Sequence, residues 1–220
     1  MWKDFAVLYR GNHQARILEQ VFRQLRIPYS ISGGQSFFDK AEVRDILAYM
    51  RLIANDDDDP AFIRAVTTPK RGVGQATLQQ LGEFANSRKV SLFAAIFEEG
   101  LSEQILERQF KSLHVFAQFI QSIQERAQQP AHIQSASALL DELMSYIRYE
   151  EYLYDAHDER SAQNRWQNVL DLLEWLKGKA ESDEMSLLDL VQHVALITML
   201  ERNEQEEEQD AVTLTTIHAS

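Results

Sequence analysis

Two adjacent cations, Lys70 and Arg71, stand directly before a Gly-x-Gly sequence, and this is the part of the chain best suited to chemistry. Gly72 and Gly74 can adopt positive φ and leave no Cβ in the way of an approaching group. Thr77 adds a hydroxyl close behind them. Backbone N–H groups in such a turn suit a phosphate, so the stretch predicts contact with a nucleic-acid backbone without base reading. An ordinary helical corner with a solvated cation pair is the alternative.

Two helices must position this turn. Apolar residues recur at helical spacing over residues 61–66 before it and over residues 78–85 after it. Pro69 ends the first helix because it cannot continue the hydrogen-bond ladder. The expected arrangement is helix, Gly-x-Gly turn, helix, with the start of the second helix aimed at the same point as the turn.

The same periodicity predicts helices through most of the chain. The expected ranges are 13–25, 40–53, 91–97, 104–128, 135–147, 161–179 and 186–200. Four closely spaced tyrosines, Tyr146, Tyr149, Tyr152 and Tyr154, could stack on bases. Their helical spacing favours packing against leucines.

Strand patterns occur only near the two ends, at residues 5–8, 29–32 and 211–217. Since two strands cannot form a stable sheet alone, the first part reads as the edge of something larger. The expected fold is mainly α: a multi-helical inserted subdomain, with a small α/β remnant formed by the two chain ends.

The composition of the chain limits the classes of function that it can have. The chain has 220 residues, 45% hydrophobic and 25% charged, with no cysteine and a formal net charge of −12. Neither a signal peptide nor an apolar run of membrane-spanning length is found, so a cytoplasmic protein without a membrane partner is expected. DNA contact on so acidic a body must come from a local basic patch, and it should weaken steeply with salt.

Two acidic stretches call for an interpretation. Residues 55–60 lack the spaced ligands and closing Glu of an EF-hand, so no metal site is expected there, and Asp59 with Pro60 predicts a helix start. Residues 201–210 carry like charges that repel one another, which predicts a solvated linker or hinge.

Four segments, in order along the chain, resemble signatures of the Rep/UvrD/PcrA-type superfamily 1A DNA helicases. In the turn, Val73 replaces the isoleucine of the family's Gly-Ile-Gly motif. The segments are 8–16 (Leu-Tyr-Arg-Gly-Asn-His-Gln-Ala-Arg), 27–51 (with Ile-Pro-Tyr, Gly-Gly, Phe-Phe and Glu-Val-Arg-Asp), 68–74 (Thr-Pro-Lys-Arg-Gly-Val-Gly) and 212–220 (Val-Thr-Leu-Thr-Thr-Ile-His-Ala-Ser), the last being the beginning of motif V.

The resemblance implies which piece of a helicase this is. Residues 34–209 would be the 2B subdomain, and residues 1–33 and 210–220 would be flanking strips of the RecA-like domain 2A. The resemblance implies an ATP-dependent 3′–5′ helicase acting in replication or repair, with ATP and Mg²⁺ as cofactors of the full-length enzyme. No phosphate loop or acidic Mg²⁺ motif is found in this chain, so it is expected to have no catalytic residues, to bind no cofactor and to be inactive alone.

The resemblance also implies site residues and partners. Duplex DNA would be held by Lys70, Arg71, the N–H groups of Gly72–Gly74 and Thr77. Asn12 and His218 would contact the single strand. The expected partners are DNA, the remaining helicase domains 1A, 1B and 2A, and replication or repair proteins. An acidic helical protein–protein interaction module with no direct DNA role is the alternative function.

Overall fold

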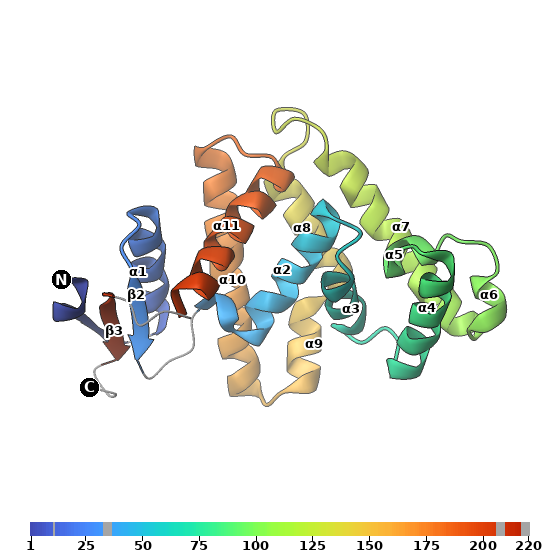
Figure 1. The fold of residues 1–220 in the computed structure, drawn as a ribbon, viewed down its shortest axis with the longest axis horizontal. Helices are drawn as coiled ribbons and strands as arrows, with labels where there is room; N and C mark the ends of the chain where they lie inside the picture. Colours follow the sequence, from blue (N-terminus) through green and yellow to red (C-terminus); the bar gives the residue numbers. More distant parts are fainter. Residues whose placement is uncertain (11, 33–36, 206–209, 217–220) are drawn as a thin grey trace. The chain divides into compact units, whose positions relative to one another are not determined.

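The computed structural model describes residues 1–10, 12–32, 37–205 and 210–216 (Figure 1). It is mainly helical with one small parallel sheet, which confirms the predicted fold class. The chain forms two compact units, one made of residues 1–43 and 192–220 and the other of residues 44–191. The predicted boundaries at 33/34 and 209/210 remain a proposal.

The sheet joins the two ends of the chain. Its strands are β1 (Ala6–Tyr9), β2 (Tyr29–Ser32) and β3 (Val212–Thr216), and β3 lies between the other two and parallel to both. Val7 and Ile31 both face Leu214 in the register. The long helical segment is therefore inserted between neighbouring strands of a single sheet.

Helix α1 (Asn12–Gln24) covers this sheet and closes a small apolar core around the buried residues Tyr9, Ala15 and Leu214. Apolar side chains on one side of an amphipathic helix can be removed from water only against such a face. The carboxylate of Glu19, on the same helix, is buried and accepts hydrogen bonds from the Tyr29 hydroxyl at 3.3 Å and the Phe37 N–H at 3.4 Å.

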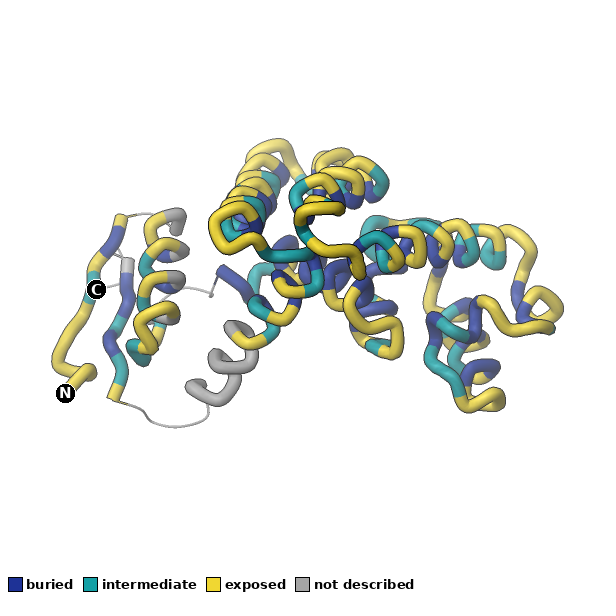
Figure 2. The backbone as a smooth tube through the Cα atoms, turned by 90° about the horizontal axis from the view of Figure 1, so that it is seen from above, coloured by how far each residue is buried: buried dark blue, intermediate teal, exposed yellow. Residues whose placement is uncertain are grey.

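The other regular elements of the described chain are helices, including the short 3-10 segments η1 (Trp2–Asp4) and η2 (Phe37–Asp39). Figure 2 shows that the helices of residues 44–191 turn their buried sides toward one another. Phe62 and Phe116 are fully buried there and meet edge to face at 6.1 Å. The helices are α2 (Ala41–Ala54), α3 (Asp59–Thr67), α4 (Gln75–Arg88), α5 (Leu92–Ala95), α6 (Leu101–Gln104), α7 (Glu107–Ala127), α8 (Ala136–Ile147), α9 (Tyr149–Ala156), α10 (Glu159–Ser182) and α11 (Leu187–Gln205).

Several boundaries differ from the sequence prediction. Helix α7 begins at Glu107 rather than at 104, because Ile105 is extended and separates it from α6. Asp58, not Asp59, caps α3, accepting from the Ala61 N–H at 3.0 Å. Asp59 instead accepts from the Leu92 N–H at 2.9 Å.

The acidic stretch is also different from the expectation. Helix α11 continues to Gln205, so residues 201–205 are helical and not part of a linker. Residues 206–209, and Gly33 and Gly34 at the other expected boundary, lie outside the described residues.

Candidate nucleic-acid interface

The Gly-x-Gly turn, defined here as residues 68–74, connects α3 to α4 as predicted. Only one of its two glycines needs the left-handed region: φ is +75° at Gly72, whereas Gly74 is extended with φ −102° and ψ −178°. Gly74 serves as the N-cap of α4, where a glycine provides no side-chain acceptor.

The start of α4 is open. In the described chain no acceptor is recorded for the N–H groups of Gln75, Ala76 and Thr77, and the first helical bond is that of Leu78 N–H to the Gly74 carbonyl. A Cβ placed on either glycine of the turn would meet no atom within 4 Å. Unsatisfied N–H groups at a helix N-terminus carry a partial positive charge, so this point suits an anion.

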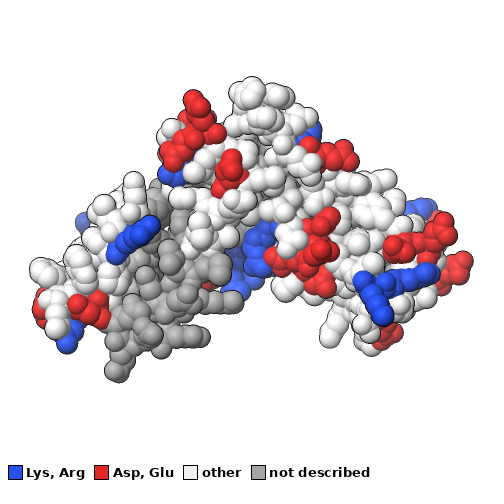
Figure 3. Space-filling model, turned by 45° about the horizontal axis from the view of Figure 1, so that its top comes forward, with Lys and Arg blue, Asp and Glu red and all other residues white. Residues whose placement is uncertain are grey.

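Lys70, four residues before the N-cap Gly74, adds a full positive charge to the same turn. Its side chain is exposed, and its ammonium has no hydrogen-bond or ion-pair partner among the residues that the structure describes. Figure 3 shows acidic side chains over several areas of one face and basic side chains in smaller groups. Lys70 is thus a cation available to a ligand on a chain of net charge −12.

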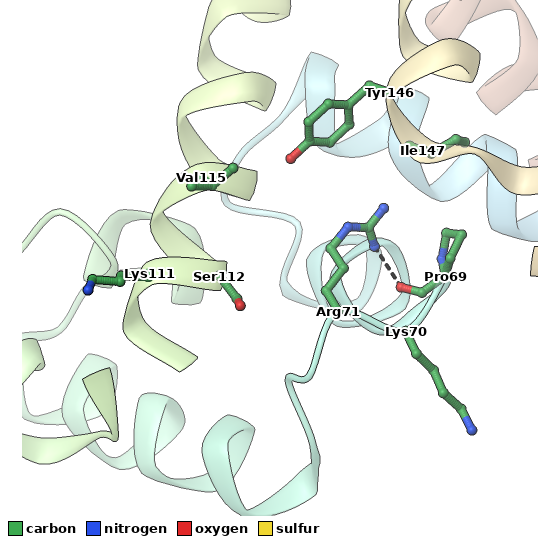
Figure 4. Close-up of a pocket in the computed structure, with 8 residues that line it drawn as sticks. All are labelled: Pro69, Lys70, Arg71, Lys111, Ser112, Val115, Tyr146 and Ile147. Atoms are coloured by element: carbon green, nitrogen blue, oxygen red, sulfur yellow. Dashed lines mark hydrogen bonds between the residues drawn. The ribbon is translucent and has the colours of Figure 1, made fainter. Parts of the chain in front are cut away.

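The side chain of Arg71 points in the opposite direction from that of Lys70, toward the interior of the protein. One nitrogen of its guanidinium donates to the Pro69 carbonyl at 2.8 Å (Figure 4) and to the Ala65 carbonyl at 2.9 Å. The other nitrogen donates to the Tyr49 hydroxyl. The guanidinium carbon also lies 5.2 Å from the centroid of the buried Phe116 ring. These contacts hold the turn against α2 and α7, since three donors of one cation are used inside the protein.

Tyr49 is the centre of this contact. Its side chain is fully buried on α2, and its hydroxyl donates to the Thr68 carbonyl at 2.7 Å while accepting from Arg71. Burial raises the pKa of this phenol well above its usual range, with the positive charge of Arg71 acting in the opposite direction. The hydroxyl therefore remains a hydrogen-bond donor at neutral pH.

A second polar cluster lies one helical turn earlier on α2. Asp45 accepts from Arg64 of α3 at 2.7 Å and from the Tyr149 hydroxyl of α9 at 2.6 Å. Asp45 and Tyr49 are four residues apart and so share one face of α2. Sequence reasoning missed both residues; the only available signal was a polar pair at i, i+4 on an otherwise apolar face.

The remaining predicted site residues are placed as follows. The side chains of Val73 and Thr77 are buried, so what they present to the outside is backbone. Asn12 begins α1, but its side chain and the whole of His218 lie outside the described part of the structure, and their contact with single-stranded DNA stays a prediction. Among the described residues, no three acidic, His or Cys side chains are grouped so as to hold a metal ion.

Comparison with known proteins identifies the family. A family model described as the UvrD-like helicase C-terminal domain matches residues 1–220, which is the entire chain. The chain belongs to the UvrD-like helicase family. Its Gly-x-Gly turn therefore occurs in a helicase C-terminal domain, and the resemblance to Rep/UvrD/PcrA-type helicases is confirmed.

The individual relatives carry helicase names. The chain is 45% identical to the ATP-dependent DNA helicase Rep of Salmonella typhimurium and 43% identical to that of Escherichia coli, each match covering 100% of this chain and 32% of the relative. It is 33% identical to the ATP-dependent DNA helicase PcrA of Bacillus subtilis, covering 99% of this chain and 29% of the relative. The chain of this UvrD-like domain thus spans about a third of the length of these relatives. In its described part no helix has the length and apolar character that crossing a membrane requires.

Proposed function

We propose that this UvrD-like chain is the duplex-DNA-contacting and regulatory region of an ATP-dependent DNA helicase. In the whole protein, ATP and Mg²⁺ would be bound by other domains and would drive 3′–5′ movement in replication or repair. Residues 34–209 would act as the 2B subdomain between two strips of domain 2A. The names of the relatives support the helicase activity, and the Gly-x-Gly turn supports the contact with duplex DNA.

The proposal rests on the presence of one available cation and an open helix start in the same turn. Lys70 supplies the charge, and the N–H groups from Gly72 to Thr77 supply short-range donors. Such a set binds phosphate oxygens, and all of its donors except Lys70 are backbone N–H groups, which fits sequence-independent contact with a duplex.

Arg71 takes a different role in this proposal from the one that its sequence position suggests. Its guanidinium is engaged with two carbonyls and with Tyr49, so it would position the turn rather than contact phosphate. Removing both cations together would therefore mix a lost DNA contact with a displaced turn.

A salt titration of duplex binding with the full chain tests the proposal. Lys70→Gln should weaken binding and reduce the slope of log K against log salt by about 0.9, the effect of one phosphate contact. The matched control is Lys89→Gln, an exposed lysine at the other end of α4, which should leave the slope unchanged.

An unchanged affinity and slope in Lys70→Gln would contradict the proposal. No duplex binding even at low salt, together with a stable complex with another protein, would favour the acidic interaction module. An equal reduction of the slope of log K against log salt in both lysine variants would indicate that binding depends on the overall charge of the chain and not on the turn.

A further inference from the structure

A pocket of about 460 Å³ opens beside the Gly-x-Gly turn, between the turn, α7 and α8 (Figure 4). Three of its lining residues are basic, namely Lys70, Arg71 and Lys111, and none of the described residues that line it is acidic. This is unusual on a chain with 34 acidic and 22 basic residues. The pocket is therefore a local site of positive charge suited to an anion.

Two hydroxyls point into the space between α7 and the turn, those of Ser112 and Tyr146 (Figure 4). Neither has a hydrogen-bond partner among the described residues. The Tyr146 ring is stacked on Phe119 of α7, with centroids 3.6 Å apart and an angle of 8° between the planes. This stacking fixes the direction of the Tyr146 hydroxyl before any ligand binds.

The protonation of Tyr146 suits a donor role. Burial raises the pKa of its hydroxyl, while the nearby charge of Arg71 acts in the opposite direction. The phenol is therefore neutral at physiological pH and can donate to an anionic oxygen.

Lys70 and Lys111 lie at the rim of the pocket, and in Figure 4 their ammonium groups point away from it. A lysine has a flexible four-carbon side chain, so each can turn toward a bound anion. Lys70 has no partner in the described chain, and Lys111 is paired only with Glu107 one turn earlier. The side chains of Lys111 and Glu107 are 70% and 80% exposed, so the pair contributes little and can be exchanged for a ligand oxygen. Arg71 adds a positive charge that is held in place against the Phe116 ring.

The remaining wall is apolar and consists of Pro69, Val115 and Ile147. A phosphate alone would leave this wall uncovered, whereas a ring-bearing ligand would bury it. The volume lies in the range of small-molecule sites, about 300–1,000 Å³.

We infer that this pocket binds one nucleotide unit, with its phosphate on the hydroxyls and lysines and its ring against the apolar wall. The unit could be a free nucleotide or an unpaired nucleotide at the end of a DNA strand, and both share this chemistry. The second source rests on the proposed function, because Lys70 would then serve the turn and the pocket together.

The first experiment measures binding of dAMP and of inorganic phosphate to the full chain by calorimetry. The double variant Ser112→Ala/Tyr146→Phe should weaken dAMP binding by about a hundredfold or more, as expected for two lost hydrogen bonds to a charged group. The matched control is Ser122→Ala/Tyr154→Phe, which alters an exposed serine of α7 and an exposed tyrosine of α9. Phosphate should bind more weakly than dAMP because it cannot cover the apolar wall.

The second experiment compares a blunt duplex with a duplex that carries one unpaired terminal nucleotide. If the pocket variant binds the duplex with the unpaired nucleotide more weakly but binds dAMP as the parent does, the pocket is assigned to DNA. If it binds only dAMP more weakly, the pocket is assigned to a free nucleotide. If the pocket variant binds both ligands with the affinity of the parent, the inference is overturned. Blunt-duplex binding that depends on Lys70 would still support the proposed function, and its independence of Lys70 would contradict that function alone.

Discussion

Replacing Tyr49 with phenylalanine removes one hydroxyl from the contact between α2 and the Gly-x-Gly turn and leaves the buried ring in place. That hydroxyl donates to the Thr68 carbonyl at 2.7 Å and accepts from Arg71. The change should therefore lower the free energy of unfolding through lost hydrogen bonds and not through lost packing, because the ring still fills the same space.

The magnitude follows from the two bonds. A hydrogen bond to a charged group contributes about 1.5–3 kcal/mol, and a neutral one contributes about 1 kcal/mol. We expect a loss of about 3 kcal/mol, which is a large part of a typical stability of about 5–15 kcal/mol. For a chain of this size that corresponds to a fall in Tm of about 6–12 °C.

The assay is urea and thermal unfolding followed by circular dichroism, with Tyr154→Phe as the control. Tyr154 is 44% exposed on α9, so its loss of a hydroxyl should change the free energy of unfolding by less than about 0.5 kcal/mol. A double-mutant cycle with Arg71→Gln should give a coupling energy of about 1.5–3 kcal/mol. Stability of Tyr49→Phe within about 0.5 kcal/mol of the parent, or zero coupling, would refute the reasoning.

Three further outcomes are expected. Above about pH 10 the unfolded chain loses the Tyr49 proton while the folded chain keeps it, because burial raises the pKa of Tyr49. The free energy of unfolding of the parent should therefore fall by about 1.4 kcal/mol more per pH unit than that of Tyr49→Phe. Urea unfolding over this range measures both, and an equal dependence on pH in the two proteins would show that Tyr49 is exposed. Gly72→Ala should lower the free energy of unfolding by about 1–2 kcal/mol because φ is +75° at this position. Gly74→Ala, at φ −102°, should lower it by less than about 1 kcal/mol. Thermal unfolding measures both, and equal losses would contradict the turn geometry. Asp58→Ala should cost about 1–2 kcal/mol through the lost cap of α3, and Asp57→Ala, an exposed neighbour, should match the parent by the same measurement.

The sequence predicted the fold class because periodicity is a local property. Strand patterns at the two ends and helical spacing between them were enough to expect a helical insertion into a sheet, and the parallel sheet of β1, β3 and β2 confirms it. The position of β3 between the other strands could not be predicted, since it depends on pairing across nearly the whole chain. A short-range break was missed as well: the extended Ile105, which separates α6 from α7 inside the predicted helix 104–128.

The Gly-x-Gly turn shows where local reasoning ends. The types and spacing of its residues predicted a turn between two helices with the start of the second helix at the turn, and the structure confirms that arrangement. The structure alone shows that only Gly72 lies in the left-handed region. Sequence alone treated Lys70 and Arg71 as equivalent cations. The tertiary structure distinguishes them, because Tyr49 and Phe116, 22 residues before Arg71 and 45 residues after it, form a partly buried site for one guanidinium. A cation partly removed from water needs such partners, and only the folded chain brings them together.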